Sequence, residues 1–330
     1  MTGQNFDVER VQAQYLLMHR IRSFEQCAVE ALQAGDVPGP IHPSIGQEAC
    51  AVAIVGSVAK EDILLSTHRG HGHTLVKGAD AKAMMCELLG RAGGCCGGKG
   101  GSMHIADFGV GMLGANGVVG ANLLIAAGAA HAITLKGEAR LVVNIFGDGA
   151  INRGPFLEAL NWAKLYALPV LFVCEDNRYS ATTRTADTTS GPGPVARAES
   201  LGIPAVSADG NDLLGLEEIA RSLVAQIRAG EGPRLLHAKT YRLTGHTATD
   251  AASYRDAEEV AHQHSLDPVL RCRELLRTAG VSAAELERLE GAASKEMSAA
   301  LAFARSAPYP PASDAFTDVQ DLDWARESQV

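Results

Sequence analysis

The sequence has no long apolar run and no excess of basic residues. Its 330 residues contain no uninterrupted apolar stretch of the roughly 18 residues that a helix needs to span a membrane. Its 38 acidic residues outnumber 29 lysines and arginines, whereas a nucleic-acid-binding surface is basic. We therefore expect neither a membrane nor a nucleic-acid partner.

Cysteine pairs with the spacing of metal ligands are also missing. The seven cysteines include no Cys-x-x-Cys pair. Cys95 and Cys96 are adjacent, an arrangement that is unfavourable for sharing one metal ion or one disulfide. The first thirty residues lack the apolar core of a secretory signal. We therefore expect reduced thiols and a cytoplasmic protein.

The periodicity of apolar residues predicts an α/β core followed by helices. Short apolar runs at 140–146 and 169–174 are typical of buried strands, and an amphipathic helix is predicted between them. Strand, helix and strand in this order form a βαβ unit, so the two strands should be parallel neighbours. After residue 256 the pattern predicts helices only. We therefore divide the chain into an α/β core over 1–256, which begins with a helix, and a helical extension over 257–330.

Glycine is in excess and clustered, but two common nucleotide-binding motifs do not fit. The chain contains 35 glycines, more than the usual share of about 7%. In the segment from Gly93 to Lys99 the residue after the lysine is Gly100, where a P-loop requires serine or threonine. The dinucleotide-binding pattern fails after Gly147, because Asn152 occupies its third glycine position.

Two polar positions follow the two predicted strands of the βαβ unit. Asp148 comes after the first strand, and Asp176 and Asn177 come after the second. Ligands of open parallel sheets bind beyond the carboxyl ends of strands, where these side chains would lie side by side. Carboxylate and amide oxygens suit Mg²⁺, which pairs with phosphates. The pattern therefore predicts a site for magnesium and a diphosphate; the alternative is that each residue only caps a turn.

Several motifs together resemble one family. They include Gly147-Asp-Gly149 followed later by Asp176-Asn177, and in chain order the flanking motifs Gly46-Gln-Glu-Ala49, Thr67-His-Arg-Gly-His-Gly72, Gly98-Lys-Gly-Gly-Ser-Met-His104, Gly114-Ala-Asn-Gly-Val-Val-Gly120 and Thr240-Tyr-Arg-Leu-Thr-Gly-His246. In this order the chain resembles the alpha subunits of heteromeric thiamine diphosphate-dependent 2-oxo acid and acetoin dehydrogenases.

The resemblance implies a fold, two cofactors and two protein partners. The fold would be the thiamine diphosphate-binding α/β fold, a parallel sheet flanked by helices, with a helical C-terminal extension. The cofactors would be thiamine diphosphate and Mg²⁺. A beta subunit would complete an α2β2 heterotetramer and supply the pyrimidine-binding half of each site. A lipoyl-bearing acyltransferase would accept the product in a multienzyme complex.

The resemblance also implies roles for individual residues. Asp148, Asn177 and the backbone carbonyl of Tyr179 would bind the metal. His42 and His246 would be the active-site histidines. The positions matching cofactor contacts are His68, Arg69, Gly117, Val119, Asp148, Gly149, Ala150, Asn177, Arg242 and His246.

Elementary chemistry agrees with two of these assignments and leaves one alternative open. A diphosphate carries more negative charge than one Mg²⁺ neutralises, so Arg69 and Arg242 are suitable donors. Histidines can donate to phosphate or move protons near neutral pH. The spacing of His68, His71 and His73 also permits a metal cluster.

The identity of the substrate stays open on these residues. Acetoin, pyruvate and branched-chain 2-oxo acids are all plausible. The segment Ser66–His73 favours acetoin, because pyruvate-type members more often have an aromatic residue where this chain has His68. Two positions depart from the family pattern: Asp176 replaces the first residue of an Asn-Asn pair, and Arg153 stands where glutamine is common. These departures leave the identity of the substrate open. A hypothesis of another class is a non-catalytic partner that only stabilises a beta subunit.

Overall fold

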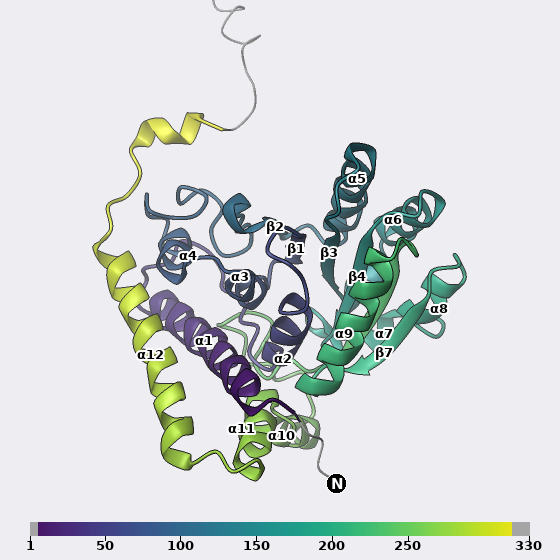
Figure 1. The fold of residues 1–330 in the computed structure, drawn as a ribbon. Helices are drawn as coiled ribbons and strands as arrows, with labels where there is room; N and C mark the ends of the chain where they lie inside the picture. Colours follow the sequence, from purple (N-terminus) through teal and green to yellow (C-terminus); the bar gives the residue numbers. More distant parts are fainter. Residues whose placement is uncertain (1–5, 319–330) are drawn as a thin grey trace, which may run out of the picture.

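A parallel sheet forms the centre of the structure, a computed structural model that describes residues 6–318 (Figure 1). The six strands lie in the order β2-β1-β3-β4-β8-β7. Their bounds are β1 Ile63–Thr67, β2 Met112–Asn116, β3 Val142–Gly147, β4 Val170–Asp176, β7 Ala205–Asp209 and β8 Arg234–Lys239. A separate antiparallel hairpin pairs β5 (Tyr179–Ser180) with β6 (Thr183–Arg184). The expected parallel α/β fold is therefore confirmed.

Both faces of the sheet are buried, which explains why its central strands are continuous apolar runs. Val142 and Phe146 of β3 point to one face, and Val143 and Ile145 point to the other. The first face is covered by α5 (Ala121–Lys136), α6 (Gly154–Leu165) and α8 (Pro194–Glu199). The opposite face is covered mainly by α1 (Val8–Gln33), α9 (Leu213–Arg228) and a π-helical turn, η1 (Ala51–Val55).

The predicted βαβ unit is confirmed, with one local difference. Strands β3 and β4 are parallel neighbours, with Gly147 of β3 opposite Glu175 of β4. The connecting helix begins at Gly154, because Arg153 is extended and Pro155 favours the first turn of a helix. Residues 148–152 form instead a 3₁₀ turn, η3 (Asp148–Asn152), directly after β3. The amides beside Asp148 therefore belong to this turn.

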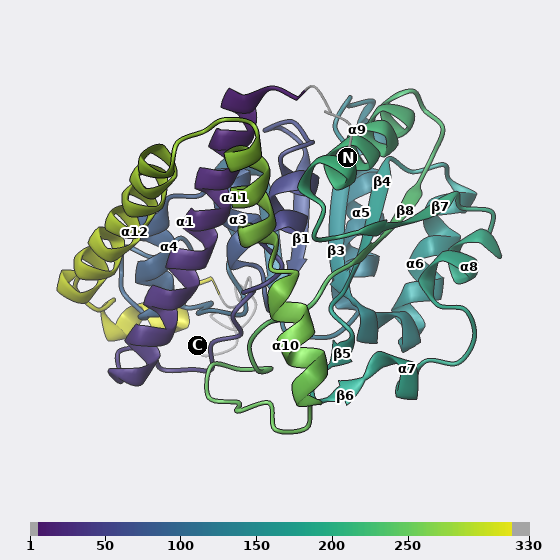
Figure 2. The ribbon, with the colours of Figure 1, turned by 90° about the horizontal axis from the view of Figure 1, so that it is seen from below.

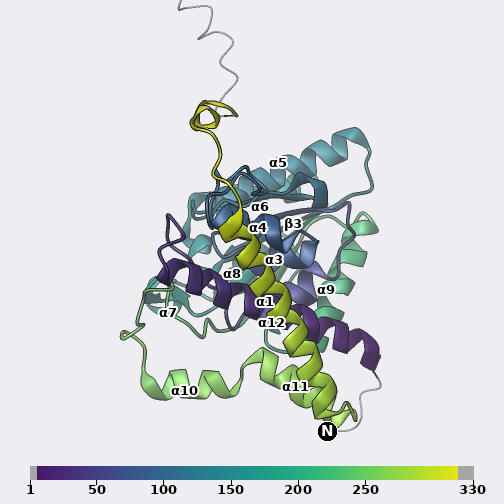
Figure 3. The same ribbon diagram turned by 90° about the vertical axis from the view of Figure 1, so that its left-hand side faces the viewer.

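The helices predicted after residue 256 are present, and the last of them lies alongside the first helix of the chain (Figures 2 and 3). They are α10 (Ala257–Ser265), α11 (Pro268–Thr278) and α12 (Ala283–Ser306). Along the α1–α12 contact, Tyr15 donates to Glu290 at 2.6 Å and Arg305 pairs with Glu30 at 3.0 Å. These contacts progress in the same direction along both helices, so the two helices are parallel. Residues 319–330 of the predicted extension lie outside the described residues.

The remaining elements are short. Their bounds are α2 Glu48–Cys50, α3 His71–Lys77, α4 Ala81–Leu88, η2 Phe108–Val110, α7 Thr185–Thr188 and η4 Ala312–Phe316. Asp80 caps α4 by accepting from the amide of Ala83. No described helix combines the length and the apolar character that crossing a membrane would require.

Candidate active site

A cavity of about 250 Å³ opens at the carboxyl ends of the strands. His68 and Arg69 follow β1, Asp148 follows β3, and Asn177 follows β4. This is where an open parallel sheet presents side chains from several strands to one ligand. The cavity wall includes every residue to which the resemblance assigned a role: His42, His68, Arg69, Gly117, Val119, Asp148, Gly149, Ala150, Asn177, Tyr179, Arg242 and His246. Asp176, which the strand-end pattern also placed here, does not line the cavity, and its Oδ2 lies 2.9 Å from Nε2 of His237.

One side of the cavity carries oxygen ligands suited to a cation. Asp148 is almost completely buried, and burial, with the nearby charge of Asp176, raises the pKa of its carboxyl to about 7. The Thr185 hydroxyl donates to this carboxylate. A divalent cation would offset the cost of burying the charge, so the position fits a metal ligand.

Asn177 is held beside Asp148 by a residue that sequence reasoning missed. The Nδ2 of Asn177 donates to Oε1 of Gln47 at 3.2 Å, which fixes the orientation of its amide. Within residues 6–318 the buried Nε2 of Gln47 has no partner. A polar ligand in the cavity would satisfy this donor. Gln47 lies in a recognised motif, Gly46-Gln-Glu-Ala49, but only the tertiary structure brings it to Asn177.

Another part of the cavity is cationic. Arg69 and Arg242 are buried, and in the described part of the chain neither guanidinium forms a salt bridge to a carboxylate. Arg69 donates to the carbonyls of Pro43 and His246. Burial and the charge of Arg242 lower the pKa of Arg69 to about 9, which still leaves it charged at neutral pH. Two uncompensated guanidinium groups make a strong site for an anion such as a diphosphate.

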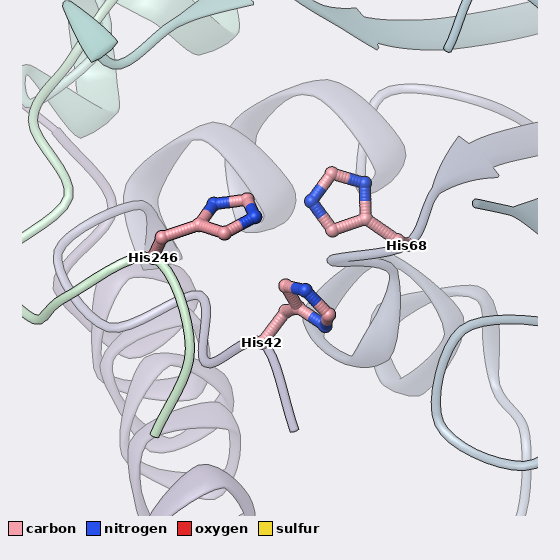
Figure 4. Close-up of side chains that lie close together, drawn as sticks. All are labelled: His42, His68 and His246. Carbon is pink, nitrogen blue, oxygen red and sulfur yellow. The ribbon is translucent and has the colours of Figure 1, made fainter. Parts of the chain in front are cut away.

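The imidazoles of His42, His68 and His246 point toward one another in the cavity (Figure 4). The ring of His42 lies 4.7 Å from that of His68 and 4.9 Å from that of His246, between centroids. Burial, followed by the charge of Arg69, lowers the pKa of all three, to about 3 for His42, about 2 for His68 and about 4 for His246. The rings are therefore neutral at physiological pH.

The histidine cluster could hold a transition metal, but its surroundings disfavour one. Nη2 of Arg69 and Nη1 of Arg242 lie 3.4 Å and 3.5 Å from Nδ1 of His246. A dication bound here would be repelled by both guanidinium groups in a buried environment. An anionic ligand would instead be attracted by both guanidinium groups.

The alternative cluster of His68, His71 and His73 does not form. His68 faces the cavity, whereas His71 hydrogen-bonds Glu25 at 2.9 Å and Ser102 at 3.0 Å. His73 contacts the Ser66 hydroxyl at 2.8 Å. The side chains point to different partners because α3 begins at His71, whereas His68 lies in the turn that follows β1.

Glycines allow the backbone to approach the cavity closely. A Cβ added at Gly149 would collide with the side chain of Ser180, and one added at Gly117 would lie 3.4 Å from the ring of His104. Ala150 and Gly149 present the amides of the 3₁₀ turn beside Asp148. Such a turn suits the binding of phosphate oxygens.

Comparison with known proteins gives one consistent result. The family model described as dehydrogenase E1 component matches residues 17–313. The chain is similar to the acetoin:2,6-dichlorophenolindophenol oxidoreductase alpha subunit of Cupriavidus necator, with 40% identity over 95% of each chain. The corresponding Bacillus subtilis subunit is 38% identical over 96% of this chain and 95% of its own. The pyruvate dehydrogenase E1 alpha subunit of Zymomonas mobilis is 37% identical over 95% of this chain and 89% of its own.

Proposed function

Because the chain belongs to the dehydrogenase E1 component family, we propose that it is the alpha subunit of a thiamine diphosphate-dependent acetoin dehydrogenase. The observation that carries this proposal is the presence of Arg69 and Arg242, both buried and without a salt bridge within residues 6–318, in the same cavity as Asp148 and Asn177. This combination suits a diphosphate bound with Mg²⁺. The cytoplasm is the proposed location, in keeping with seven free cysteines.

Each part of the cavity has a proposed ligand. Asp148, Asn177 and the carbonyl of Tyr179 would hold Mg²⁺. Arg69, Arg242 and the turn at 149–150 would bind the diphosphate, with His68 beside it, and Gly117 and Val119 would flank the aminopyrimidine. When bound, thiamine diphosphate supplies a carbon nucleophile and an electron sink for breaking a carbon–carbon bond next to a carbonyl.

The histidines of the cavity would take part in the cleavage of acetoin. Cleavage of acetoin between its carbonyl and carbinol carbons requires removal of the hydroxyl proton, whereas decarboxylation of pyruvate releases carbon dioxide without that step. His42 and His246 line the cavity, and an anionic diphosphate beside Arg69 would offset the charge that lowers their pKa values, so that either could accept this proton. Arg69 holds the carbonyl of His246 at 3.1 Å and thereby orients this histidine.

An exposed apolar face supports assembly with other subunits. Leu124, Ile125 and Leu135 of α5 are at least 41% exposed, and Trp162 and Leu165 of α6 are similarly exposed. Gly128 lies in the middle of this face, where nothing would contact an added Cβ. An apolar face of this kind marks a protein interface. We propose that it packs against subunits of an α2β2 heterotetramer, which would deliver the two-carbon product to a lipoyl-bearing acyltransferase.

Pyruvate is the second candidate, because a pyruvate dehydrogenase alpha subunit is 37% identical to this chain. The test is co-expression with a beta subunit and dye-reduction turnover with acetoin, pyruvate and a branched-chain 2-oxo acid. We expect Mg²⁺-dependent turnover with kcat/KM highest for acetoin. A higher value for pyruvate would favour the second candidate. Absence of both turnover and thiamine diphosphate binding would favour a non-catalytic partner.

A further inference from the structure

The glycine-rich segment 90–102 contains a pair of reactive thiols outside the cavity. Of the seven cysteines, all within the described residues, Cys95 and Cys96 are partly exposed and the other five are buried. Their sulfur atoms and the Glu87 carboxylate lie within 4.8 Å of one another. The pair is therefore accessible to small molecules, and its two sulfurs are close enough to react in sequence.

Cys96 is the activated member of the pair. Its sulfur accepts a hydrogen bond from the amide of Ala106 at 3.1 Å. The hydrogen bond from the Cys95 thiol and this amide lower the pKa of Cys96, against the opposing effects of burial and Glu87. The thiolate is the nucleophilic form of cysteine, so the lowered pKa makes Cys96 the more reactive of the two, and Cys95 beside it can resolve the first oxidation product.

Glu87 holds the backbone of segment 90–102 in its conformation and contacts the residue that carries the reactive thiol. Its buried carboxylate accepts from the amides of Cys96 at 2.7 Å, Gly98 at 2.9 Å and Gly100 at 2.7 Å. The same segment continues to Met103, which lines the cavity, and to His104, which packs against Gly117. A change at Cys96 therefore reaches the wall of the cavity through a short, continuous piece of backbone.

We propose that Cys95 and Cys96 form a reversible oxidation site for hydroperoxides. The Cys96 thiolate attacks the peroxide, which forms a sulfenic acid and releases an alcohol or water. Cys95 then attacks the sulfenic sulfur and releases water, so two thiols and one hydroperoxide give one disulfide, one alcohol (or water) and one water.

The geometry makes the product easy to reverse. Adjacent Cα atoms are about 3.8 Å apart, closer than the roughly 4.4–6.8 Å of ordinary disulfides. The two sulfurs, which lie within 4.8 Å of each other, must approach to about 2 Å. The distortion that this forces on the 95–96 peptide weakens the bonds of the Cys96 amide to Glu87 and of its sulfur to Ala106. The strained disulfide is readily reduced by thiols. While it persists, the segment ending at Met103 and His104 is displaced, and cofactor affinity falls.

The experiment uses the assembled enzyme without the acyltransferase, so that lipoyl thiols do not compete. The complex is treated with hydrogen peroxide, its free thiols are blocked, and the peptide carrying residues 95–96 is examined by mass spectrometry. We expect an internal disulfide, a loss of thiamine diphosphate affinity of about tenfold or more, and recovery of both after treatment with a thiol. The chemical readout does not depend on the proposed function, whereas the affinity readout does.

Three variants make the outcome decisive. Cys96→Ser should resist low doses of peroxide. Cys95→Ser should be oxidised at Cys96 beyond the sulfenic acid, and thiol should no longer restore affinity. Cys27→Ser, which changes a buried cysteine on α1, should behave like the unmodified enzyme. Peroxide inactivation with both thiols of the 95–96 peptide intact, or equal sensitivity of Cys96→Ser, would overturn the proposal.

Discussion

Nδ1 of His71 lies 2.9 Å from Oε2 of Glu25, and neither side chain has exposed surface. The other carboxylate oxygen of Glu25 accepts from the amide and the hydroxyl of Ser44, at 3.0 Å and 2.7 Å. His71 also contacts Ser102, next to Met103 of the cavity wall. This buried network therefore ties the loop carrying His42 to the glycine-rich segment.

Glu25→Gln should destabilise the chain in a pH-dependent way. Burial alone would raise the pKa of Glu25, but His71 and the hydrogen bonds from His71 and Ser44 outweigh it and lower the pKa below its ordinary 4.5. The stabilisation is therefore complete above that pH and is lost as pH falls through the folded-state value. We expect the free energy of unfolding at pH 7 to fall by about 3 kcal/mol.

Urea unfolding of both proteins across a pH series checks this expectation. The difference between wild type and Glu25→Gln should shrink at acidic pH, because the wild-type carboxyl is then protonated. Glu9→Gln on the exposed side of the same helix is the control and should change little. A difference that stays constant down to acidic pH would show that the charge of Glu25 is not what stabilises the network.

Gly128→Leu should prevent assembly without unfolding the chain. Nothing lies within 4 Å of a Cβ added at this helical position, so the subunit can accommodate the leucine. In a close helix contact the same side chain would collide with a neighbouring subunit. Light scattering after size exclusion should show a smaller particle. Gly291→Leu, an equally open helical glycine on α12, is the control. A heterotetramer of normal size would refute the proposed interface.

His68→Tyr should shift the substrate preference away from acetoin. The change introduces an aromatic residue at the position where pyruvate-type members more often carry one, so the cavity wall becomes more like theirs. We expect the ratio of kcat/KM for acetoin to that for pyruvate to fall by about tenfold. Steady-state dye reduction measures both values, with the exposed His262→Asn as control. An unchanged ratio would show that His68 does not determine which substrate is preferred.

The parts of the fold that could be predicted from sequence are those whose burial leaves a local pattern. Strands β3 and β4 are buried on both faces and are therefore uninterrupted apolar runs. Their order around one helix also placed Asp148 beside Asn177, because parallel neighbours end at the same edge. Strands β2 and β7 were missed. Met112–Asn116 contains a glycine, and Ala205–Asp209 is a half-exposed edge strand without clear alternation.

The candidate site was predicted in outline, but its cross-connections were not. Motifs supplied the cavity residues one by one, and the structure brings them to one cavity. The contact between Gln47 and Asn177 joins segments far apart in the chain, so no local sequence pattern predicts it. The same holds for His71, whose buried partner Glu25 lies on α1. No sign in the sequence showed that the helix between β3 and β4 begins only at Gly154, after the tighter turn formed by residues 148–152.

We propose that this cavity binds thiamine diphosphate through a metal held by Asp148. The most direct measurement is calorimetric titration of thiamine diphosphate, in the presence of Mg²⁺, into the assembled wild-type enzyme and its Asp148→Ala variant. Loss of a metal ligand should weaken cofactor binding by at least about 10–100-fold, while Asp187→Ala, an exposed carboxylate on α7, should bind normally. Equal affinity of wild type and Asp148→Ala would contradict the account and leave Asp148 as a residue that only shapes the turn after β3.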